Sequence, residues 1–116
     1  MKSINMLSLS LSLCSALMLG NAALAEEASV TISAPVDGAK LDGMEPGAVE
    51  YEAVPGPRGD HVHMYVDGEE VAVLRKLAGS YTLASLDPGQ RKLCIKIVNK
   101  GHTPIGVEKC ITVTVE

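Results

Sequence analysis

From Ser29 onward, polar and apolar residues alternate in short runs that Gly, Pro and Asp interrupt. No stretch keeps the spacing of an apolar helix face for three turns, so the pattern predicts strands throughout. The interruptions are typical of turns: "APVDGAKLDGMEPG", "PGPRGD", "DG", "KLAGS", "LDPGQ" and "NKGHTPIG". Between them we expect strands at residues 30–33, 48–54, 61–66, 70–74, 80–85, 91–99 and 107–115.

The number and spacing of these strands indicate the fold class. Seven strands in about ninety residues, with a turn roughly every ten, is the proportion of an immunoglobulin-like or fibronectin-like sandwich. The chain has no Trp, and its second expected strand has no Cys to bond across the two sheets. We therefore expect an all-β, immunoglobulin/fibronectin-like sandwich of about seven antiparallel strands over residues 26–116, similar to that class in architecture alone.

The first 25 residues have the pattern of a secretory signal peptide. Lys2 precedes the apolar stretch "MLSLSLSLCSALMLG", and an A-x-A cleavage pattern ends at Ala25. We expect residues 1–25 to be removed after Ala25, which would place the mature protein in the periplasm or outside the cell. A lipoprotein anchored at Cys14 is the alternative, but it needs a small residue where Leu13 stands.

The charge of the mature chain excludes some partners. Its 91 residues would carry nine Lys and Arg against 14 Asp and Glu, a net charge of −5. No cluster of basic residues is suited to holding phosphates, so nucleic acid is not an expected partner. No second apolar run is long enough to span a bilayer, so no membrane span is expected after cleavage.

Cleavage would leave two cysteines, Cys94 and Cys110, in an oxidising compartment. We expect a disulfide, and two thiolate metal ligands are the alternative. If the cysteines face each other in an antiparallel hairpin, Lys96 faces Glu108, a pairing of opposite charges that a sheet surface favours. The disulfide then lies on the outer face, within one sheet. Lys109 is the exception, because it would point inward unless a bulge forms or its side chain snorkels.

The segment "DHVHMYVDG" contains two of the three histidines of the chain. Val62, Met64 and Val66 supply an apolar face, so His61 and His63 must point to the other side of the strand. They are therefore not expected in the core. Two interpretations fit this parity: the histidines are metal ligands, or they are polar residues on a solvated face.

The third histidine, His102, falls at the centre of the register that the cysteine pair sets, so we expect it at the tip of the last hairpin. In a seven-strand sandwich this tip lies at the same end as the loop "PGPRGD". His61, His63 and His102 should then converge at one rim. Neutral imidazole binds copper and zinc, and side chains two positions apart on a strand can bridge one ion. We expect a metal site here, with copper favoured and zinc as the alternative.

Other residues bear on the chemistry of this rim. Asp60 is a candidate fourth ligand, although alternation sends it to the opposite face. Arg75 and Lys76 should share the rim, and their positive charge disfavours a cation and suits an anion or an acidic partner. A methionine-rich Cu(I) site has no support, because Met44 is expected in a turn at the other end and Met64 is expected to point inward.

The run "DHVHMYVDG" followed by "LDPGQRKLCIKIVNKGHTPI" resembles small exported bacterial Ig-like domains of largely unknown function. These carry an H-x-H strand before a D-G turn, a P-G turn opening a long strand, and an H-x-P-type loop. The similarity covers about residues 30–116 and implies that His61, His63 and His102 are recurrent histidines. Such domains often have another histidine after the P-G turn, where this chain has Gln90 and Arg91. The resemblance implies no substrate and no catalytic residue.

These observations favour a small binding protein of the cell envelope that holds a metal ion through three histidines. The alternative is a structural or protein-interaction module of the envelope without metal. An enzyme is not expected, because no Ser has a histidine partner and the cysteines are committed to each other. A sugar-binding module has less support, since only Tyr51, Tyr65 and Tyr81 could stack on sugar rings.

Overall fold

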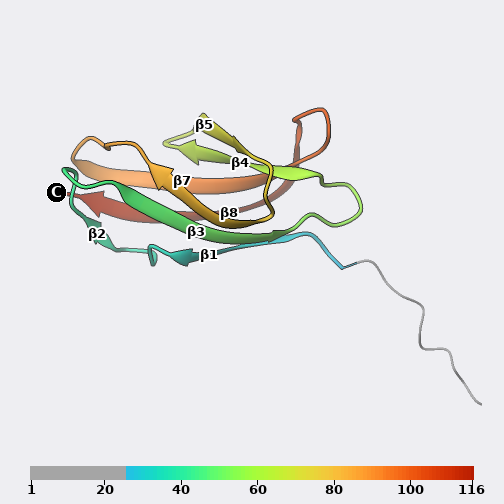
Figure 1. Ribbon diagram of the computed structural model, residues 1–116, viewed down its shortest axis with the longest axis horizontal. Coiled ribbons are helices and arrows are strands. Elements are labelled where there is room, and N and C mark those ends of the chain that lie inside the picture. The colour runs from blue at the N-terminus through green and yellow to red at the C-terminus, as the bar shows by residue number, and fades with distance from the viewer. Residues whose placement is uncertain (1–25) are drawn as a thin grey trace, which may run out of the picture.

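The computed structural model describes residues 26–116, which form a sandwich of two sheets (Figure 1). One sheet has the strand order β1-β3-β6 and the other has the order β2-β8-β7-β4-β5. The strands are β1 (Ser29–Ala34), β2 (Lys40–Leu41), β3 (Gly47–Val54), β4 (His61–Val66), β5 (Glu69–Leu74), β6 (Ala78–Leu83), β7 (Gly89–Val98) and β8 (Pro104–Val115). In this part of the chain there is no helix of the length and apolar character needed to cross a membrane. The expected signal peptide, residues 1–25, lies outside the described residues.

The prediction of an all-β sandwich is confirmed, and each of the seven expected strands is present. These seven strands pair antiparallel, as expected, and the structure adds one strand that was not predicted, the two-residue β2, which runs parallel to β8. β2 lies inside a turn-rich segment and is too short for an alternating pattern. Its pairing with Thr114 and Val115 of β8 defines it, and no local sequence signal does.

Alternation along the strands builds the core between the two sheets. Val62 and Met64 of β4 face inward, as expected, and both are fully buried. Each large aliphatic side chain buried in this way stabilises the fold by about 1.5–3 kcal/mol. The other buried members of the core are Val49, Tyr51, Ala53, Leu83, Leu93, Ile95, Ile97, Ile111, Val113 and Val115. Tyr51 keeps its hydroxyl satisfied by donating to the carbonyl of Lys76 at 2.8 Å, and burial raises the pKa of this hydroxyl.

The hairpin of β7 and β8 has the register that the cysteine pair predicted. Cys94 faces Cys110 and the two form a disulfide within one sheet. Lys96 faces Glu108, with Nζ 3.8 Å from Oε1. Lys109 opposes a core residue without a register shift, and its side chain is exposed, so the snorkelling alternative holds and the bulge alternative does not.

The register changes near the end of this hairpin, and this corrects the expected position of the tip. Beyond Lys96 the pairing shifts, so that Val98 faces Pro104 and the connecting loop spans residues 99–103. The centre of that loop is Gly101, and His102 follows it. The extra residues lie on β8 around Gly106, whose φ of 94° favours glycine and is typical of a bulge.

The disulfide should contribute to stability without defining the fold. Replacing both Cys94 and Cys110 with Ser should lower the free energy of unfolding by about 3 kcal/mol, because a cross-link over a loop of this length restricts the unfolded chain. Urea denaturation measures the change, with the exposed β8 substitution Thr112→Ser as control. A double variant that loses its β-sheet circular dichroism, or one that unfolds at the urea concentration of the parent, would contradict this.

Candidate metal centre

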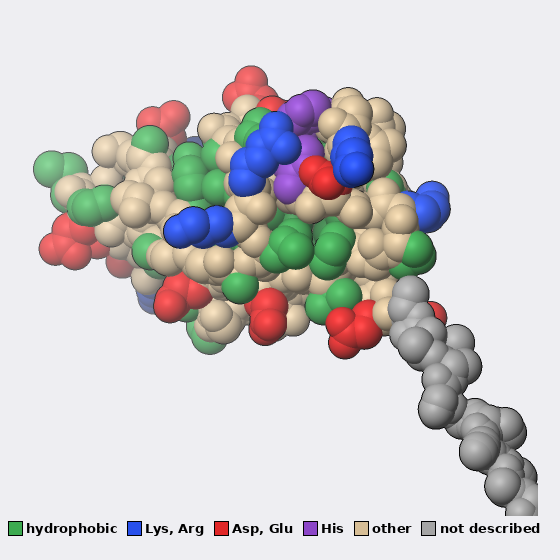
Figure 2. Space-filling view, turned by 45° about the vertical axis from the view of Figure 1, so that its right-hand side comes forward, with side chains coloured by type: hydrophobic (Ala, Val, Ile, Leu, Met, Phe, Trp, Pro, Cys, Tyr) green, Lys and Arg blue, Asp and Glu red, His purple; other side chains and the backbone are tan. Residues whose placement is uncertain are grey.

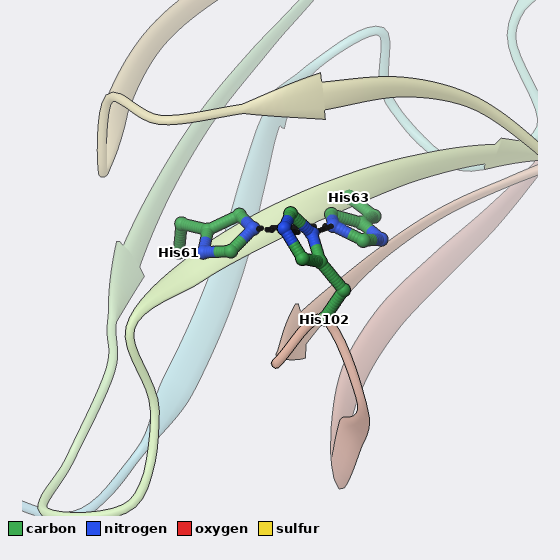
Figure 3. Close-up of side chains that lie close together, drawn as sticks. All are labelled: His61, His63 and His102. Atoms are coloured by element: carbon green, nitrogen blue, oxygen red, sulfur yellow. Dashed lines mark hydrogen bonds between the residues drawn. The ribbon is translucent and has the colours of Figure 1, made fainter. Parts of the chain in front are cut away.

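β4 and the loop at residues 99–103 bring the three histidines together (Figure 3). β4 lies between β7 and β5, and His61 and His63 project from its outer face, away from the core. The loop folds back over them and supplies His102, whose ring centroid is 4.8 Å from that of His61 and 5.2 Å from that of His63. The predicted convergence at one rim is confirmed.

The burial of two of these side chains was not predicted. His61 and His63 are each only 1% exposed, whereas His102 is exposed. The interpretation of His61 and His63 as residues of a solvated face is therefore wrong. Alternation correctly excluded them from the core, but the loop that carries His102 covers this part of the outer face.

One nitrogen from each ring meets the other two in a small triangle. Nε2 of His61 lies 3.2 Å from Nε2 of His63. Nδ1 of His102 lies 3.2 Å from Nε2 of His61 and 3.0 Å from Nε2 of His63. A metal ion bonded to each nitrogen at about 2.0–2.1 Å would fit this triangle. Such an ion would lie about 1 Å out of the plane of the three nitrogens, with N–metal–N angles near 100°. The three side chains could hold one metal ion.

Carboxylates lie on the far side of the two buried rings. Nδ1 of His61 donates to Oδ2 of Asp60 at 2.9 Å. Nδ1 of His63 lies 3.0 Å from Oε1 of Glu70, an ion-pair distance that does not meet the geometry of a hydrogen bond. A carboxylate can only accept a hydrogen bond, so these neighbours favour the tautomers that carry the proton on Nδ1 and leave the lone pair of each Nε2 directed at the triangle.

The protonation of His63 is biased toward the neutral form. Burial lowers the pKa of this imidazole, the charge of Glu70 opposes the shift, and His61 and His102 add to it. A histidine must be neutral at the coordinating nitrogen to bind a metal ion. The environment of His63 therefore favours the form that can act as a ligand.

The loop before β4 lies beside the loop that carries His102, as predicted. Nη2 of Arg58 donates to the carbonyl of Ile105 at 3.3 Å, and the backbone N–H of Asp60 donates to the carbonyl of Val98 at 2.8 Å. Gly59 allows this approach, since a Cβ at this position would collide with the carbonyl of Pro55 and the side chain of Ile97. The start of β4 is thus fixed against the end of β7.

His102 has an unusual backbone that its neighbours impose. Its φ of 67° lies in the left-handed region, which is uncommon for a residue with a side chain. Oδ1 of Asn99 accepts from the N–H groups of Gly101 and Thr103 at 2.9 and 3.0 Å, and the carbonyl of Asn99 accepts from the N–H of His102 at 2.9 Å. Asn99 therefore holds the loop in the shape that aims the ring of His102 at β4.

Some expectations about the rim need correction, and some residues were missed. Asp60 is not grouped with the three ligands; it lies behind His61 and orients that ring. Arg75 does share the rim, with Nη1 4.0 Å from Oδ2 of Asp60. Sequence reasoning missed Glu70 and Asn99, although an Asn opening a Gly-containing loop is a known turn signal.

Sulfur ligands do not contribute to this centre. Cys94 and Cys110 are bonded to each other, so the alternative of two thiolate ligands is wrong. Met64 is fully buried in the core and Met44 is 90% exposed in a turn, as expected for both.

Comparison with known proteins bears on the fold. No protein-family profile and no curated protein sequence matches the chain. Among solved structures, it is similar to the fibronectin(III)-like modules of Clostridium thermocellum CbhA, with a TM-score of 0.63 and 17% identity over 75% of this chain and 95% of that one. The fold is fibronectin-like. An engineered protein gives a TM-score of 0.54 and 18% identity over 78% of this chain and 20% of that one.

Removing the side-chain acceptor of Asn99 should loosen the loop while leaving the sandwich intact. In Asn99→Ala, the amides of Gly101 and Thr103 lose their acceptor, worth about 1 kcal/mol in total at an exposed site, so their hydrogen exchange should accelerate about fivefold. Hydrogen exchange followed by NMR measures this. Asn99→Asp keeps an oxygen acceptor and should retain most of the protection. Equal exchange in Asn99→Ala and in the exposed control Lys100→Ala would contradict the role of Asn99.

Proposed function

We propose that this domain binds one metal ion, with copper favoured, through Nε2 of His61, Nε2 of His63 and Nδ1 of His102. The observation that carries the proposal is the triangle of nitrogens 3.0–3.2 Å apart. The carboxylates of Asp60 and Glu70 lie beside Nδ1 of His61 and Nδ1 of His63, which favours the tautomers whose Nε2 lone pairs face each other. Lone pairs at this distance repel unless a proton or a cation lies between them.

The chemistry of the donors supports copper over other divalent ions. All three ligands are imidazoles, which suit copper, zinc and nickel. At a given nitrogen site copper binds most tightly in the Irving–Williams order, and zinc is the alternative. We propose a resident or carried ion in a binding protein and no catalytic role.

We propose that the protein acts in the periplasm or outside the cell. The apolar segment and A-x-A pattern before Glu26 support export. The disulfide of Cys94 and Cys110 is of the kind that persists in an oxidising compartment. The proposed place of the chain among small exported bacterial Ig-like domains with an H-x-H strand is consistent with both features.

A protein-interaction module without metal is the second candidate. The observation in its favour is the exposure of Val71 and Val73 on β5, at 44% and 42%. Val73 pairs with His63 in the register of the sheet, so an apolar contact surface would adjoin the histidines. A partner protein of the envelope would dock there in this alternative.

Single substitutions of the histidines separate these two candidates. His61→Ala, His63→Ala and His102→Ala should each weaken copper binding about a hundredfold or more, equivalent to about 2.7 kcal/mol, because each removes one of three ligands. Isothermal titration of the mature domain at neutral pH, with a competing chelator, measures the affinity. Lys100→Ala, on the same loop as His102, is the control and should bind as the parent does.

The contrary outcomes favour the interaction module. A parent that binds neither copper nor zinc at micromolar concentration would exclude the metal site. Three histidine variants that bind as tightly as the parent would place the ion elsewhere.

The affinity should also depend on pH with a defined sign. Protons compete with the ion for the imidazoles, so affinity should fall as the pH drops below about 6.5, the ordinary histidine value. Because the pKa of His63 is lowered, this ligand should enter the competition at a lower pH than an ordinary histidine would. Titrations between pH 5 and 8 measure the profile, and an affinity that rises on acidification would be inconsistent with imidazole ligands.

A further inference from the structure

We propose that the bound ion keeps a coordination position open to a small anionic donor from solution, such as a halide, a carboxylate or azide. This inference rests on the metal site proposed above and concerns how its coordination is completed. It follows from the number of protein ligands, from the shape of the nitrogen triangle, from the positions of the nearby carboxylates and from the local charge.

The protein supplies three donors at this site. Among the His, Cys, Asp and Glu side chains of residues 26–116, the group that contains the histidines has His61, His63 and His102 as its only members. Zinc sites with three protein ligands normally take a fourth ligand from solvent or substrate. Cu(II) prefers tetragonal geometry, which also needs at least a fourth donor.

The shape of the triangle limits how the three protein donors would surround an ion. The point equidistant from the three nitrogens in their own plane is about 1.8 Å from each, shorter than the 2.0 Å expected for a metal–nitrogen bond. An ion at a normal bond length would therefore lie off the plane of the three nitrogens, and His61, His63 and His102 would all bind it from one side. A flat three-coordinate ion would need nitrogens about 3.4–3.6 Å apart, whereas these are 3.0–3.2 Å apart.

The two nearest carboxylates are held away from this position. Asp60 bonds to Nδ1 of His61 and Glu70 faces Nδ1 of His63, on the ring edges opposite to the triangle. Either carboxylate would have to abandon the ring that it orients in order to reach the ion. No further His, Cys, Asp or Glu of residues 26–116 is grouped with the histidines, so we expect the donor that completes the coordination to come from solution.

The local charge favours an anion over a neutral donor. A divalent ion is balanced by the carboxylates of Asp60 and Glu70, and Lys96 is balanced by Glu108. Arg75 remains, with its guanidinium 4.0 Å from Asp60 and its side chain 66% exposed. In Figure 2 the visible histidine atoms are bordered by Lys and Arg side chains together with an acidic one. The metal-loaded rim would thus carry a net positive charge that an anion neutralises.

Azide titration of the Cu(II)-loaded mature domain tests the inference. Azide should bind saturably at one equivalent, with a new azide-to-copper charge-transfer band and an altered electron paramagnetic resonance spectrum while the copper stays bound. In Arg75→Gln the dissociation constant for azide should rise about two- to fivefold, the effect of one charge several ångströms away in a largely hydrated setting. Lys40→Gln, which removes a charge from β2 instead of the rim, should leave it unchanged.

The outcomes distinguish this inference from the proposed function. If copper binds through the histidines but azide leaves its spectra unchanged, the open position is overturned and the metal site stands. The same holds if azide removes the copper from the protein. Equal azide affinity in Arg75→Gln and Lys40→Gln would overturn the preference for an anion. A parent that binds no copper would overturn the metal site and the inference with it.

Discussion

The pairing of β4 with β7 determines most of what this domain can do. His61 pairs with Val98, the last residue of β7, so the first histidine of β4 lies directly beside the point where the chain leaves the sheet. The five residues that follow must turn back to start β8, and this turn carries His102 over the outer face (Figures 1 and 3). A shift of one residue in this pairing would turn both β4 histidines inward, because side chains alternate along a strand.

The remaining structure keeps this pairing in place. The inward residues Val62 and Met64 of β4 and Leu93, Ile95 and Ile97 of β7 are fully buried, which penalises any slip of the register. The disulfide fixes β7 against β8 at the middle of the hairpin, and the ion pair of Lys96 and Glu108 lies two residues closer to the loop. The loop itself is held by Asn99. The histidine cluster therefore rests on two rigid strands and one short, hydrogen-bonded connection.

Period-two alternation and the paired cysteines were sufficient to predict much of this arrangement. Side chains alternate between the two faces of a strand, which gives the face of β4 that carries His61 and His63. The pairing of the two cysteines then gives the outward disulfide and the pairing of Lys96 with Glu108. The loop contact between Arg58 and Ile105 follows from the order of strands in a sandwich.

What escaped prediction depends on departures from regular geometry. The bulge at Gly106 moves the loop centre by one residue, and a strictly regular ladder cannot show it. A second irregularity, between Met64 and Tyr65, affects how β5 pairs with β4 near Glu70. The burial of His61 and His63 depends on how the loop folds in three dimensions, which parity alone does not describe. The two-residue strand β2 exists only through its partner β8.

The lone pairs that face each other between His61 and His63 make the cluster locally frustrated. The two rings meet at their Nε2 atoms under a loop, and a carboxylate beside each Nδ1 disfavours the move of the ring proton to Nε2. Such an arrangement opposes the stability of the sandwich, and the surrounding core must outweigh it. The same frustration makes the cluster selective: a group without a positive charge or a hydrogen-bond donor offers no relief to facing lone pairs, whereas a cation placed between them converts a repulsive contact into a binding one.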